Sequence, residues 1–334
     1  MIGTALTKIL LGRKNILKKL FVLFVTAILC ATTIVSCSTP SNKTSSTTPS
    51  QSTTSASGWV SQKDPGFYQG LEIGTVWGTS SSDVFAVGRQ GTIIHYNGKV
   101  WATMTSGTTD DLYGIWGISP SDVYACGTDG IILHYDGKIW SPMVSNSAVI
   151  FTRMWGSSSS DIFAVATLGA IQHYDGKTWS SMTISVPVNW FYDVWGTSSS
   201  DVFAVGLGGT ILHYDGNAWT SMSSGTTNYI ASIWGSSQSN VFAVGDGGTI
   251  LHYDGNTWSS MTSGTAAPLE GIWGDSPSDI FAVGNGGIVL HYDGNAWSSL
   301  PSGVTTNFLC VWGSSSSDIF AGGADGNIWH YSGN

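Results

Sequence analysis

Seven histidines offer the most versatile chemistry in this chain of 334 residues, because an imidazole can bind a metal ion or carry a proton. Each is followed by a tyrosine, and they recur every 39 or 40 residues, at His95, His134, His173, His213, His252, His291 and His330. A zinc site needs several ligands that converge on one ion. These histidines occupy equivalent positions in seven successive repeats, so we expect their side chains to lie in seven separate places. We therefore expect each histidine to form a hydrogen bond within its own repeat, and we predict neither a metal ion nor a cofactor.

Two sets of aspartates recur with the same period. The first set lies before a short apolar run in each repeat and comprises Asp83, Asp122, Asp161, Asp201, Asp279 and Asp318. The second set begins an Asp-Gly pair after each His-Tyr pair and comprises Asp136, Asp175, Asp215, Asp254 and Asp293. Asn240 takes the first position in repeat 5 and Asn97 takes the second in repeat 1, so neither position requires a charge. We assign both sets to hydrogen bonding in turns, where aspartate and asparagine are interchangeable.

Groups suited to catalysis are sparse outside these sets. A glycosidase needs two facing carboxyl groups whose pKa values differ, and Glu72 and Glu270 are the only glutamates in the sequence. A sialidase-type site needs three arginines, and only Arg89 and Arg153 follow residue 58. Motifs for a nucleophile elbow, a phosphate loop, a zinc protease or an EF-hand do not occur in the sequence. These observations favour a protein without catalytic activity.

The repeat itself predicts local structure. Each copy contains a Trp-Gly pair, which begins at Trp77, Trp116, Trp155, Trp195, Trp234, Trp273 and Trp312. In repeat 1 we expect four strands: a segment that ends at Trp77, residues 84–87, residues 92–96, and a segment that begins at Trp101. The apolar runs, broken by glycine and Asx-Gly pairs, are typical of short strands joined by tight turns.

The turns also predict a register. The Asx-Gly pair that begins at Asn97 is typical of a two-residue type I′ hairpin, which would place Ile94 opposite Trp101. A two-residue turn on the other side of the same strand would place Ile94 opposite Phe85. Both faces of such a sheet are mainly apolar, so each sheet must pack between two others.

Sheets that pack in this way around a common axis form a β-propeller. The last repeat ends one strand short, whereas residues 58–61 form an outer strand without the three that should precede it. We expect this N-terminal strand to complete the last blade, because closure removes the exposed edges of an open array. The sequence thus predicts one all-β domain at residues 58–334, a monomeric seven-bladed β-propeller with four-stranded blades.

The first residues are expected to direct export. Five cations and no acid precede an apolar run at residues 20–31, as in a secretory signal. The sequence Ile-Val-Ser-Cys at residues 34–37 resembles the lipobox of bacterial lipoproteins. That resemblance implies a signal peptide at residues 1–36 and a lipid on Cys37. An uncleaved membrane anchor at residues 20–36 is the alternative.

Residues 37–57 would then comprise the lipidated cysteine and a tether rich in Ser and Thr. We expect an exported protein that is held at the cell-envelope membrane only through its lipid, in the outer membrane if the bacterium has two membranes. Loss of residues 1–36 leaves seven Lys and Arg against 21 Asp and Glu, a net charge of −14. Nucleic acid is excluded as a ligand, because phosphate backbones need clustered cations.

The Tyr-Asp-Gly-x-x-Trp hairpin and the glycine-rich strand before it resemble shortened Asp-box (BNR-type) or kelch-like repeats. The repeats also resemble the seven-bladed propellers of the photosystem II stability/assembly factor type. The resemblance covers residues 58–334 and implies the propeller fold. Propellers include lyases, sialidases, dehydrogenases and scaffolds, so a fold of this kind does not by itself assign an activity.

Differences among the repeats concentrate in two sets of segments. The connecting loops between repeats comprise residues 105–114, 144–153, 183–193, 223–232, 262–271 and 301–310. The second turns, between the second and third strands, comprise residues 89–90, 128–129, 167–168, 207–208, 246–247, 285–286 and 324–325. In a propeller both sets open on one face around the channel. Variable loops on a constant frame are where binding residues usually lie.

Eight residues of these segments are our candidates for binding: Arg89, Tyr113, Arg153, Trp190, Tyr192, Asp193, Tyr229 and Glu270. Arg153 and Asp193 hold equivalent positions in adjacent repeats, and we expect an ion pair between them. Aromatic and arginine anchors suit a protein or a glycan, so we predict a non-catalytic binding or scaffold module for one of these partners. The alternatives are a carbohydrate-active hydrolase or lyase that uses acids of the channel mouth, and an assembly factor for an envelope complex.

Overall fold

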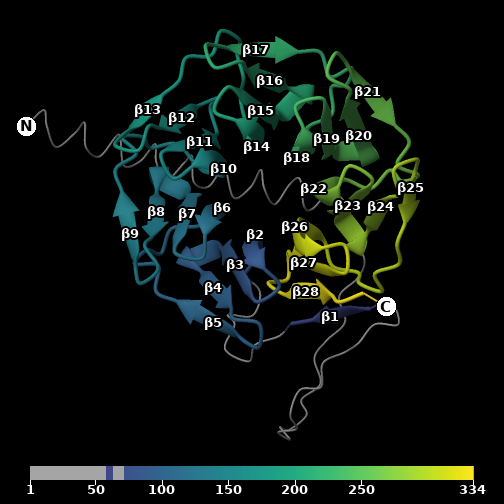
Figure 1. Cartoon of the computed structure of the whole chain (residues 1–334), viewed down its shortest axis with the longest axis horizontal. Helices are drawn as coiled ribbons and strands as arrows, with labels where there is room; N and C mark the ends of the chain where they lie inside the picture. The colour runs from purple at the N-terminus through teal and green to yellow at the C-terminus, as the bar shows by residue number, and fades with distance from the viewer. Residues whose placement is uncertain (1–57, 63–70, 334) are drawn as a thin grey trace, which may run out of the picture. The chain divides into compact units, whose positions relative to one another are not determined.

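The computed structural model describes residues 58–62 and 71–333, which form seven four-stranded antiparallel sheets. The sheets are arranged as blades around a ring (Figure 1), which confirms the predicted seven-bladed β-propeller. The chain divides into the units Met1–Ser50 and Gln51–Asn334, and the propeller belongs to the second. The expected signal peptide, the lipid site at Cys37 and the tether lie outside the described residues. No helix among the described residues is long and apolar enough to cross a membrane.

Each blade has an inner strand, two middle strands and an outer strand. The inner strands are β2 (Ile73–Ser80), β6 (Leu112–Ser119), β10 (Phe151–Ser158), β14 (Phe191–Ser198), β18 (Ile230–Ser237), β22 (Leu269–Ser276) and β26 (Phe308–Ser315). The second strands are β3 (Asp83–Gly88), β7 (Asp122–Gly127), β11 (Asp161–Ala166), β15 (Asp201–Gly206), β19 (Asn240–Gly245), β23 (Asp279–Gly284) and β27 (Asp318–Gly323). The inner strands surround the central channel (Figure 1).

The outer half of each blade is a hairpin. The third strands are β4 (Ile93–Tyr96), β8 (Ile132–Tyr135), β12 (Ile171–Tyr174), β16 (Ile211–Tyr214), β20 (Thr249–Tyr253), β24 (Val289–Tyr292) and β28 (Ile328–Tyr331). The outer strands are β5 (Trp101–Met104), β9 (Trp140–Met143), β13 (Trp179–Ser181), β17 (Trp219–Met222), β21 (Trp258–Met261), β25 (Trp297–Ser299) and, in the last blade, β1 (Trp59–Ser61).

The register within a blade differs by one residue from the predicted one. Ile94 pairs with Ala86 rather than with Phe85, because the second turn has three residues instead of two. This turn is a single 3₁₀ turn in five blades, at Arg89–Gly91, Thr128–Gly130, Leu207–Gly209, Asp246–Gly248 and Asn285–Gly287. Its middle residue adopts a left-handed conformation, with φ of 55° at Gln90. The consequence is that His95 lies opposite Phe85.

The Asx-Gly hairpin is also longer than predicted. Tyr96 pairs with Trp101, so four residues form the turn where the type I′ prediction had two. The side chain of Asn97 accepts hydrogen bonds from the backbone N–H groups of Lys99 and Val100, at 3.1 and 3.0 Å. These two bonds stabilise the longer turn, and Gly98 supplies its positive φ of 85°. Aspartate does the same in the other hairpins, which explains why Asp and Asn alternate there.

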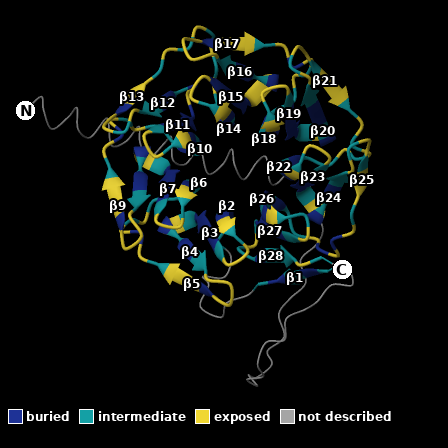
Figure 2. Ribbon diagram, in the orientation of Figure 1, coloured by how far each residue is buried: buried dark blue, intermediate teal, exposed yellow. Residues whose placement is uncertain are grey.

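The hydrophobic core lies between neighbouring blades. Buried residues form seven clusters, and one of them joins Phe85 and Val87 of the first blade to Leu112 and Ile115 of the second. Figure 2 shows most buried residues in the inner and middle strands and the exposed ones in the turns and along the outer strands. Each fully buried side chain of this size contributes about 1.5–3 kcal/mol. Strands that are apolar on both faces are stable here because every blade is covered on both sides.

Trp-Gly pairs join each blade to the next. The ring of Trp77 packs where Gly117 of the second blade has no side chain, and a Cβ there would lie 2.6 Å from the ring. The same contact recurs around the whole ring, between Trp116 and Gly156, Trp155 and Gly196, Trp195 and Gly235, Trp234 and Gly274, Trp273 and Gly313, and Trp312 and Gly78. The Trp-Gly motif is therefore a packing device rather than a source of chemistry.

The N-terminal strand closes the last blade, as predicted. β1 pairs antiparallel with β28, with Trp59 opposite Tyr331 and Val60 opposite His330. In Figure 1 the two strands lie side by side although they come from opposite ends of the chain. The Trp59 side chain is fully buried and packs against Phe308 at 5.7 Å between ring centroids.

Candidate binding site at the channel mouth

The seven histidines are structural. His95 Nε2 lies 2.7 Å from Asp83 Oδ1, and the imidazole stacks on Phe85 at 4.2 Å between ring centroids. The same pair forms between His134 and Asp122, His173 and Asp161, His213 and Asp201, His291 and Asp279, and His330 and Asp318. His252 bonds to Asn240 instead. The predicted hydrogen bond within each repeat is thus confirmed. Within the ranges that the structure describes, no group of three or more His, Cys, Asp or Glu could hold a metal ion.

The connecting loops and the second turns meet on one side of the ring, as predicted. The backbone N–H of Leu207, in a second turn, donates to the carbonyl of Trp190, the last residue before an inner strand, at 3.0 Å. Asp246 donates in the same way to Tyr229 at 3.1 Å. We call the end of the central channel where these segments lie the channel mouth. These backbone bonds hold the residue before each inner strand at the rim of the channel mouth.

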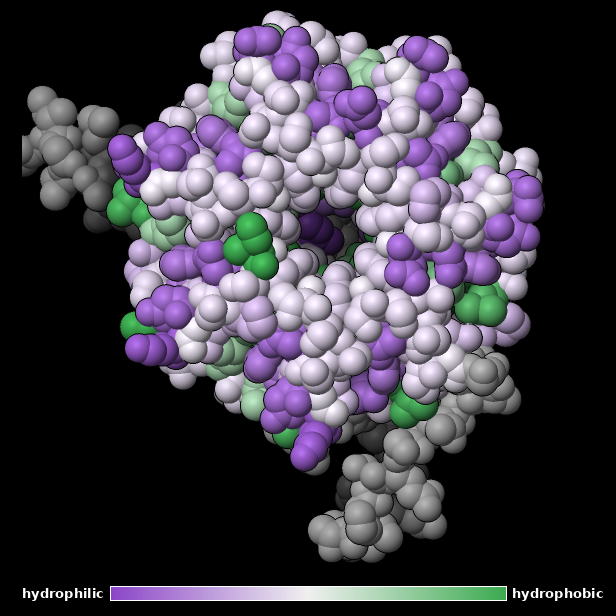
Figure 3. Space-filling model, viewed as in Figure 1, coloured by the Kyte–Doolittle hydropathy of each residue, from purple (hydrophilic) through white to green (hydrophobic). Residues whose placement is uncertain are grey.

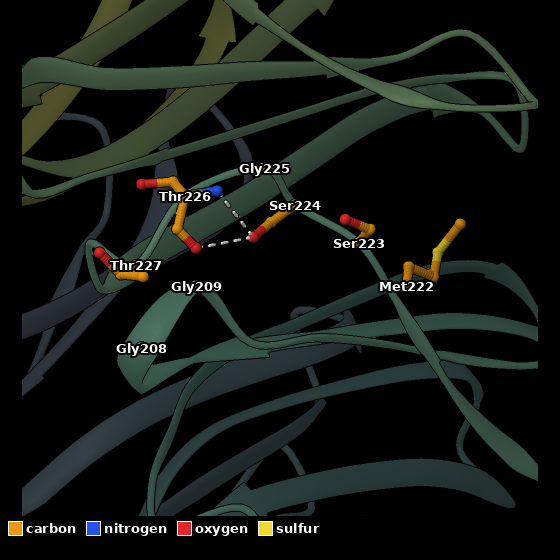
Figure 4. Close-up of a pocket in the computed structure, with 8 residues that line it drawn as sticks. All are labelled: Gly208, Gly209, Met222, Ser223, Ser224, Gly225, Thr226 and Thr227. Atoms are coloured by element: carbon orange, nitrogen blue, oxygen red, sulfur yellow. Dashed lines mark hydrogen bonds between the residues drawn. The ribbon is translucent and has the colours of Figure 1, made fainter.

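Part of each connecting loop belongs to the repeating frame. A depression of about 550 Å³ lies between Gly208 and Gly209 of a second turn and residues 222–227 of the following segment. Figure 4 shows the residues that line it. Ser224 Oγ donates to the carbonyl of Thr226 at 3.2 Å and so fixes a tight turn. An equivalent depression in the first blade holds the matching turn at Ser106. The two depressions have matching linings that consist mainly of Gly, Ser and Thr. The residues that differ between blades are therefore sought in the second half of each connecting loop.

One wall of the channel mouth carries a charge network. Arg89 Nε donates to Glu72 Oε2 at 2.5 Å, and one terminal nitrogen of the guanidinium lies 2.5 Å from the same oxygen. The other terminal nitrogen lies 3.3 Å from Asp111. Asp111 also accepts a bond from the backbone N–H of Gln90 at 2.8 Å and one from the hydroxyl of Tyr113 at 3.4 Å. Burial, with the nearby carboxylate of Asp111, raises the pKa of Tyr113. The network sets one positive charge against two carboxylates and holds Arg89 across two blades.

Arg153 does not pair with Asp193, which corrects the predicted ion pair. Its guanidinium donates to the backbone carbonyls of Tyr113, at 2.6 Å, and Gly74, at 3.2 Å, in the two preceding blades. Every inner strand has an irregularity at its second residue, which leaves such carbonyls without a ladder partner. Asp193 accepts bonds from Ser232 Oγ at 2.7 Å and from two backbone N–H groups. Burial raises the pKa of Asp193, against the opposing effect of the Arg153 charge.

The other wall carries rings and one carboxylate, which we call the aromatic–acidic wall: Trp190, Tyr192, Tyr229 and Glu270. Trp190 stacks on Tyr192 at 6.1 Å between ring centroids, and Tyr192 lies 5.6 Å from Tyr229. The hydroxyl of Tyr229 donates to Glu270 Oε1 at 3.0 Å. These residues come from three consecutive blades, so the wall depends on the packing of neighbouring blades against one another.

Burial shifts the ionisation of this wall. The pKa of Glu270 is raised mainly because neighbouring protein atoms displace water, and the charge of Asp246 adds to the effect. The hydrogen bond from Tyr229 and the charge of Arg153 act in the opposite direction. Burial also raises the pKa of Tyr192 to about 12, and that of Tyr229 further, so both phenols stay protonated. The wall therefore presents neutral rings and a single carboxyl group.

The ring is hollow at its centre on the side that Figure 3 shows, with hydrophilic residues in its depth. The structure places seven of the eight candidates on inner strands or in the segments that lead into them, and Arg89 in a second turn. It gathers the eight into the charge network, the aromatic–acidic wall and the Arg153–Asp193 region. Asp111 and Asp246 were missed. Their position in the repeat could have revealed them, since Asp111 precedes an inner strand as Trp190 does and Asp246 occupies a second turn as Arg89 does.

Comparison with known proteins supports the fold. No protein-family model and no curated protein matches the sequence. A structure of YCF48 bound to a D1 peptide superposes with a TM-score of 0.69 at 16% identity, over 83% of this chain and 96% of that one. YCF48 from Cyanidioschyzon merolae gives 0.68 at 15%, over 82% and 98%. The WD40 β-propeller domain of Doa1 gives 0.68 at 14%, over 82% and 95%. At these identities the likeness shows the fold alone.

Proposed function

We propose that this protein is an exported, lipid-anchored propeller that binds a peptide segment of a protein partner at the channel mouth, without catalysis. The observation that carries the proposal is the aromatic–acidic wall. Its residues occupy two positions at the start of the inner strand whose residue type varies between blades, and three blades bring them together at the mouth. Rings that display both an apolar face and a polar tip are the usual anchors of protein interfaces. An assembly factor for an envelope complex is one form of this function, in which the partner is a subunit of that complex.

The similar structures support a peptide ligand. One of them contains YCF48 with a bound D1 peptide, so a propeller of this fold can bind a peptide. In the present chain the mouth offers Arg89 on one wall and Trp190 on the other as anchors of different chemistry. A glycan could stack on the same rings, and binding assays with both ligand classes separate the two.

Affinity capture tests the site. The full chain with a C-terminal tag is used to recover partners from envelope extracts, beside Trp190→Ala and Ile139→Ala. Ile139 is 62% exposed in an outer hairpin turn, at the opposite end of its strands from the second turns. We expect the same specific partner with wild type and Ile139→Ala and its loss with Trp190→Ala. Identical recovery from all three would refute the channel-mouth assignment.

The lipid anchor has its own test. Export and lipidation are proposed from residues 1–37, and Cys37 is the residue that would carry the lipid. Metabolic labelling with a fatty acid should label wild type and not Cys37→Ser, and the variant should leave the membrane fraction. Equal labelling of both proteins would contradict the anchor.

A hydrolase or lyase is the second candidate, because one observation favours it. Glu270 combines a raised pKa with a hydrogen bond from Tyr229, as an acid catalyst at a mouth would. Assays of wild type and Glu270→Gln against envelope glycans decide the point. Turnover by wild type that the variant loses would replace the binding function with an enzymatic one.

A further inference from the structure

Carboxylates at the channel mouth differ in how their charge is balanced. Glu72 is paired with the guanidinium of Arg89 at 2.5 Å. Asp193 accepts three hydrogen bonds from the protein. Glu270 accepts one, from the hydroxyl of Tyr229, and within the described ranges no Lys or Arg nitrogen lies within 4 Å of it. Of these three carboxylates, Glu270 is thus the one that accepts a single hydrogen bond and has no cation of the described residues in contact with it.

The surroundings of Glu270 favour a positive charge. Asp246 interacts unfavourably with Glu270 and with Tyr229, so the local potential is negative on this wall. Arg153 opposes that potential without contacting Glu270, because its guanidinium donates to the backbone carbonyls of Tyr113 and Gly74. A carboxylate in such a site would form its most stabilising hydrogen bond with a positively charged group of a ligand.

The rings next to Glu270 suit the same kind of ligand. Trp190, Tyr192 and Tyr229 follow one another at 6.1 and 5.6 Å between centroids, and Tyr229 touches the carboxylate through its hydroxyl. Aromatic faces carry negative charge density, and Trp and Tyr are the strongest side chains for binding an organic cation in this way. A ligand that follows the wall toward Glu270 would therefore meet a cation-binding surface before it meets the carboxylate.

We infer that the aromatic–acidic wall binds the ammonium group of a lysine side chain on the partner, an inference that rests on the proposed function. Tyr229 donates to one oxygen of Glu270, so only the other oxygen has no donor among the described residues. That geometry suits a compact ammonium group, whereas a guanidinium forms its strongest bond with two carboxylate oxygens at once. The net charge of −9 would also attract a basic segment.

The test uses small probes and the full chain in detergent. Nα-acetyl-lysine methylamide is titrated and followed through the Trp indole resonances, with Trp190→Phe used to assign the signal of Trp190. The Nε-acetylated form of the probe, which is neutral, is the matched control ligand. We expect the cationic probe to shift the Trp190 signal and the neutral probe to lose about tenfold or more in affinity. Equal binding of the two probes would overturn the inference.

Variants separate charge from shape. Glu270→Gln keeps the size of the side chain and should weaken the cationic probe about tenfold. Asp215→Asn is the control, because Asn97 already occupies the equivalent turn position in the first blade. Unchanged affinity in Glu270→Gln, with a wild-type unfolding midpoint, would refute the ammonium site.

Failure of this inference and failure of the proposed function give different results. If Trp190→Ala loses the captured partner but Glu270→Gln keeps it, the partner binds at the mouth without a lysine at Glu270, and the inference fails alone. If the cationic probe binds through Glu270 but capture recovers no specific partner, the ammonium site stands and the proposed function fails.

Discussion

The indole ring of Trp312, in the last blade, packs directly over Gly78 in the first. A Cβ at Gly78 would lie 2.9 Å from that ring and 2.5 Å from the carbonyl oxygen of Asp83. This contact completes the series of Trp-Gly contacts and joins the blade that ends the chain to the blade that follows its first strand.

The substitution Gly78→Ala is expected to destabilise the propeller by about 1–3 kcal/mol, because an added methyl group overpacks the contact between the last and first blades. Gly74→Ala is the control, since the nearest atoms to its added Cβ lie at 3.2 Å and belong to a less crowded site. Urea unfolding measures both. A larger loss in Gly74→Ala than in Gly78→Ala would show that the Trp312 contact is not tight.

Loss of the closing strand should cost more than loss of the same strand position elsewhere. Trp59→Ala removes a fully buried ring and is expected to cost about 3–5 kcal/mol. Trp258 holds the equivalent position in β21 but is only partly buried, so Trp258→Ala should cost less. Equal unfolding midpoints for the two variants would argue that β1 contributes no more than any other outer strand.

Leu168 is a site where a substitution should stabilise the protein. It is 79% exposed and has a φ of 59°, a conformation that costs a residue with a side chain about 1 kcal/mol. Leu168→Gly relieves this strain. It should raise the free energy of unfolding, measured with urea, by up to about 1 kcal/mol. Gly208 holds the position of Leu168 in the next blade, and Leu207 is the residue before it. Leu207 does not have a positive φ, so Leu207→Gly should instead destabilise the protein. The opposite order of the two variants would contradict the argument.

The fifth blade should respond to pH differently once its histidine has an acidic partner. Burial lowers the pKa of His252, whose partner Asn240 is neutral. A lowered pKa in the folded state means that this group loses stability as the pH falls below its ordinary value of about 6.5. Asn240→Asp places a carboxylate against the ring, which should raise the pKa of His252 and make the variant relatively more stable at pH 5 than at pH 8, by about 0.5–1 kcal/mol.

An NMR titration of the His252 ring measures this pKa, and urea unfolding at both pH values measures the stability. Asn217→Asp adds the same charge in an exposed turn and serves as the control. If both variants shift the pH dependence equally, the effect comes from net charge and not from the His252 contact.

The repeat made the fold predictable, because its period and its complementary ends constrain the whole chain at once. Residues 58–61 match the missing strand of the last repeat, and the structure pairs Trp59 with Tyr331 accordingly. Register was not predictable in the same way. The register depends on the left-handed residue in the second turn. In the first blade that residue is Gln90, a residue type that does not predict a positive φ.

The location of the candidate residues was predictable, but their contacts were not. Variable segments pointed to the channel mouth, and Trp190, Tyr192, Tyr229 and Glu270 do lie there together. The partner of Arg153 could not be read from spacing, because its guanidinium reaches carbonyls in two other blades. A long side chain at the centre of the ring can reach acceptors from several blades. Every residue has a backbone carbonyl, so the sequence does not indicate which one accepts the bond.

The pairing of β1 with β28 has a mechanical consequence. Any tension applied to the chain ahead of Gly58 acts first on a ladder of three residue pairs, and that ladder is the one that closes the ring. A pull from this end would therefore peel away the strand on which the last blade depends before it loads any of the other six.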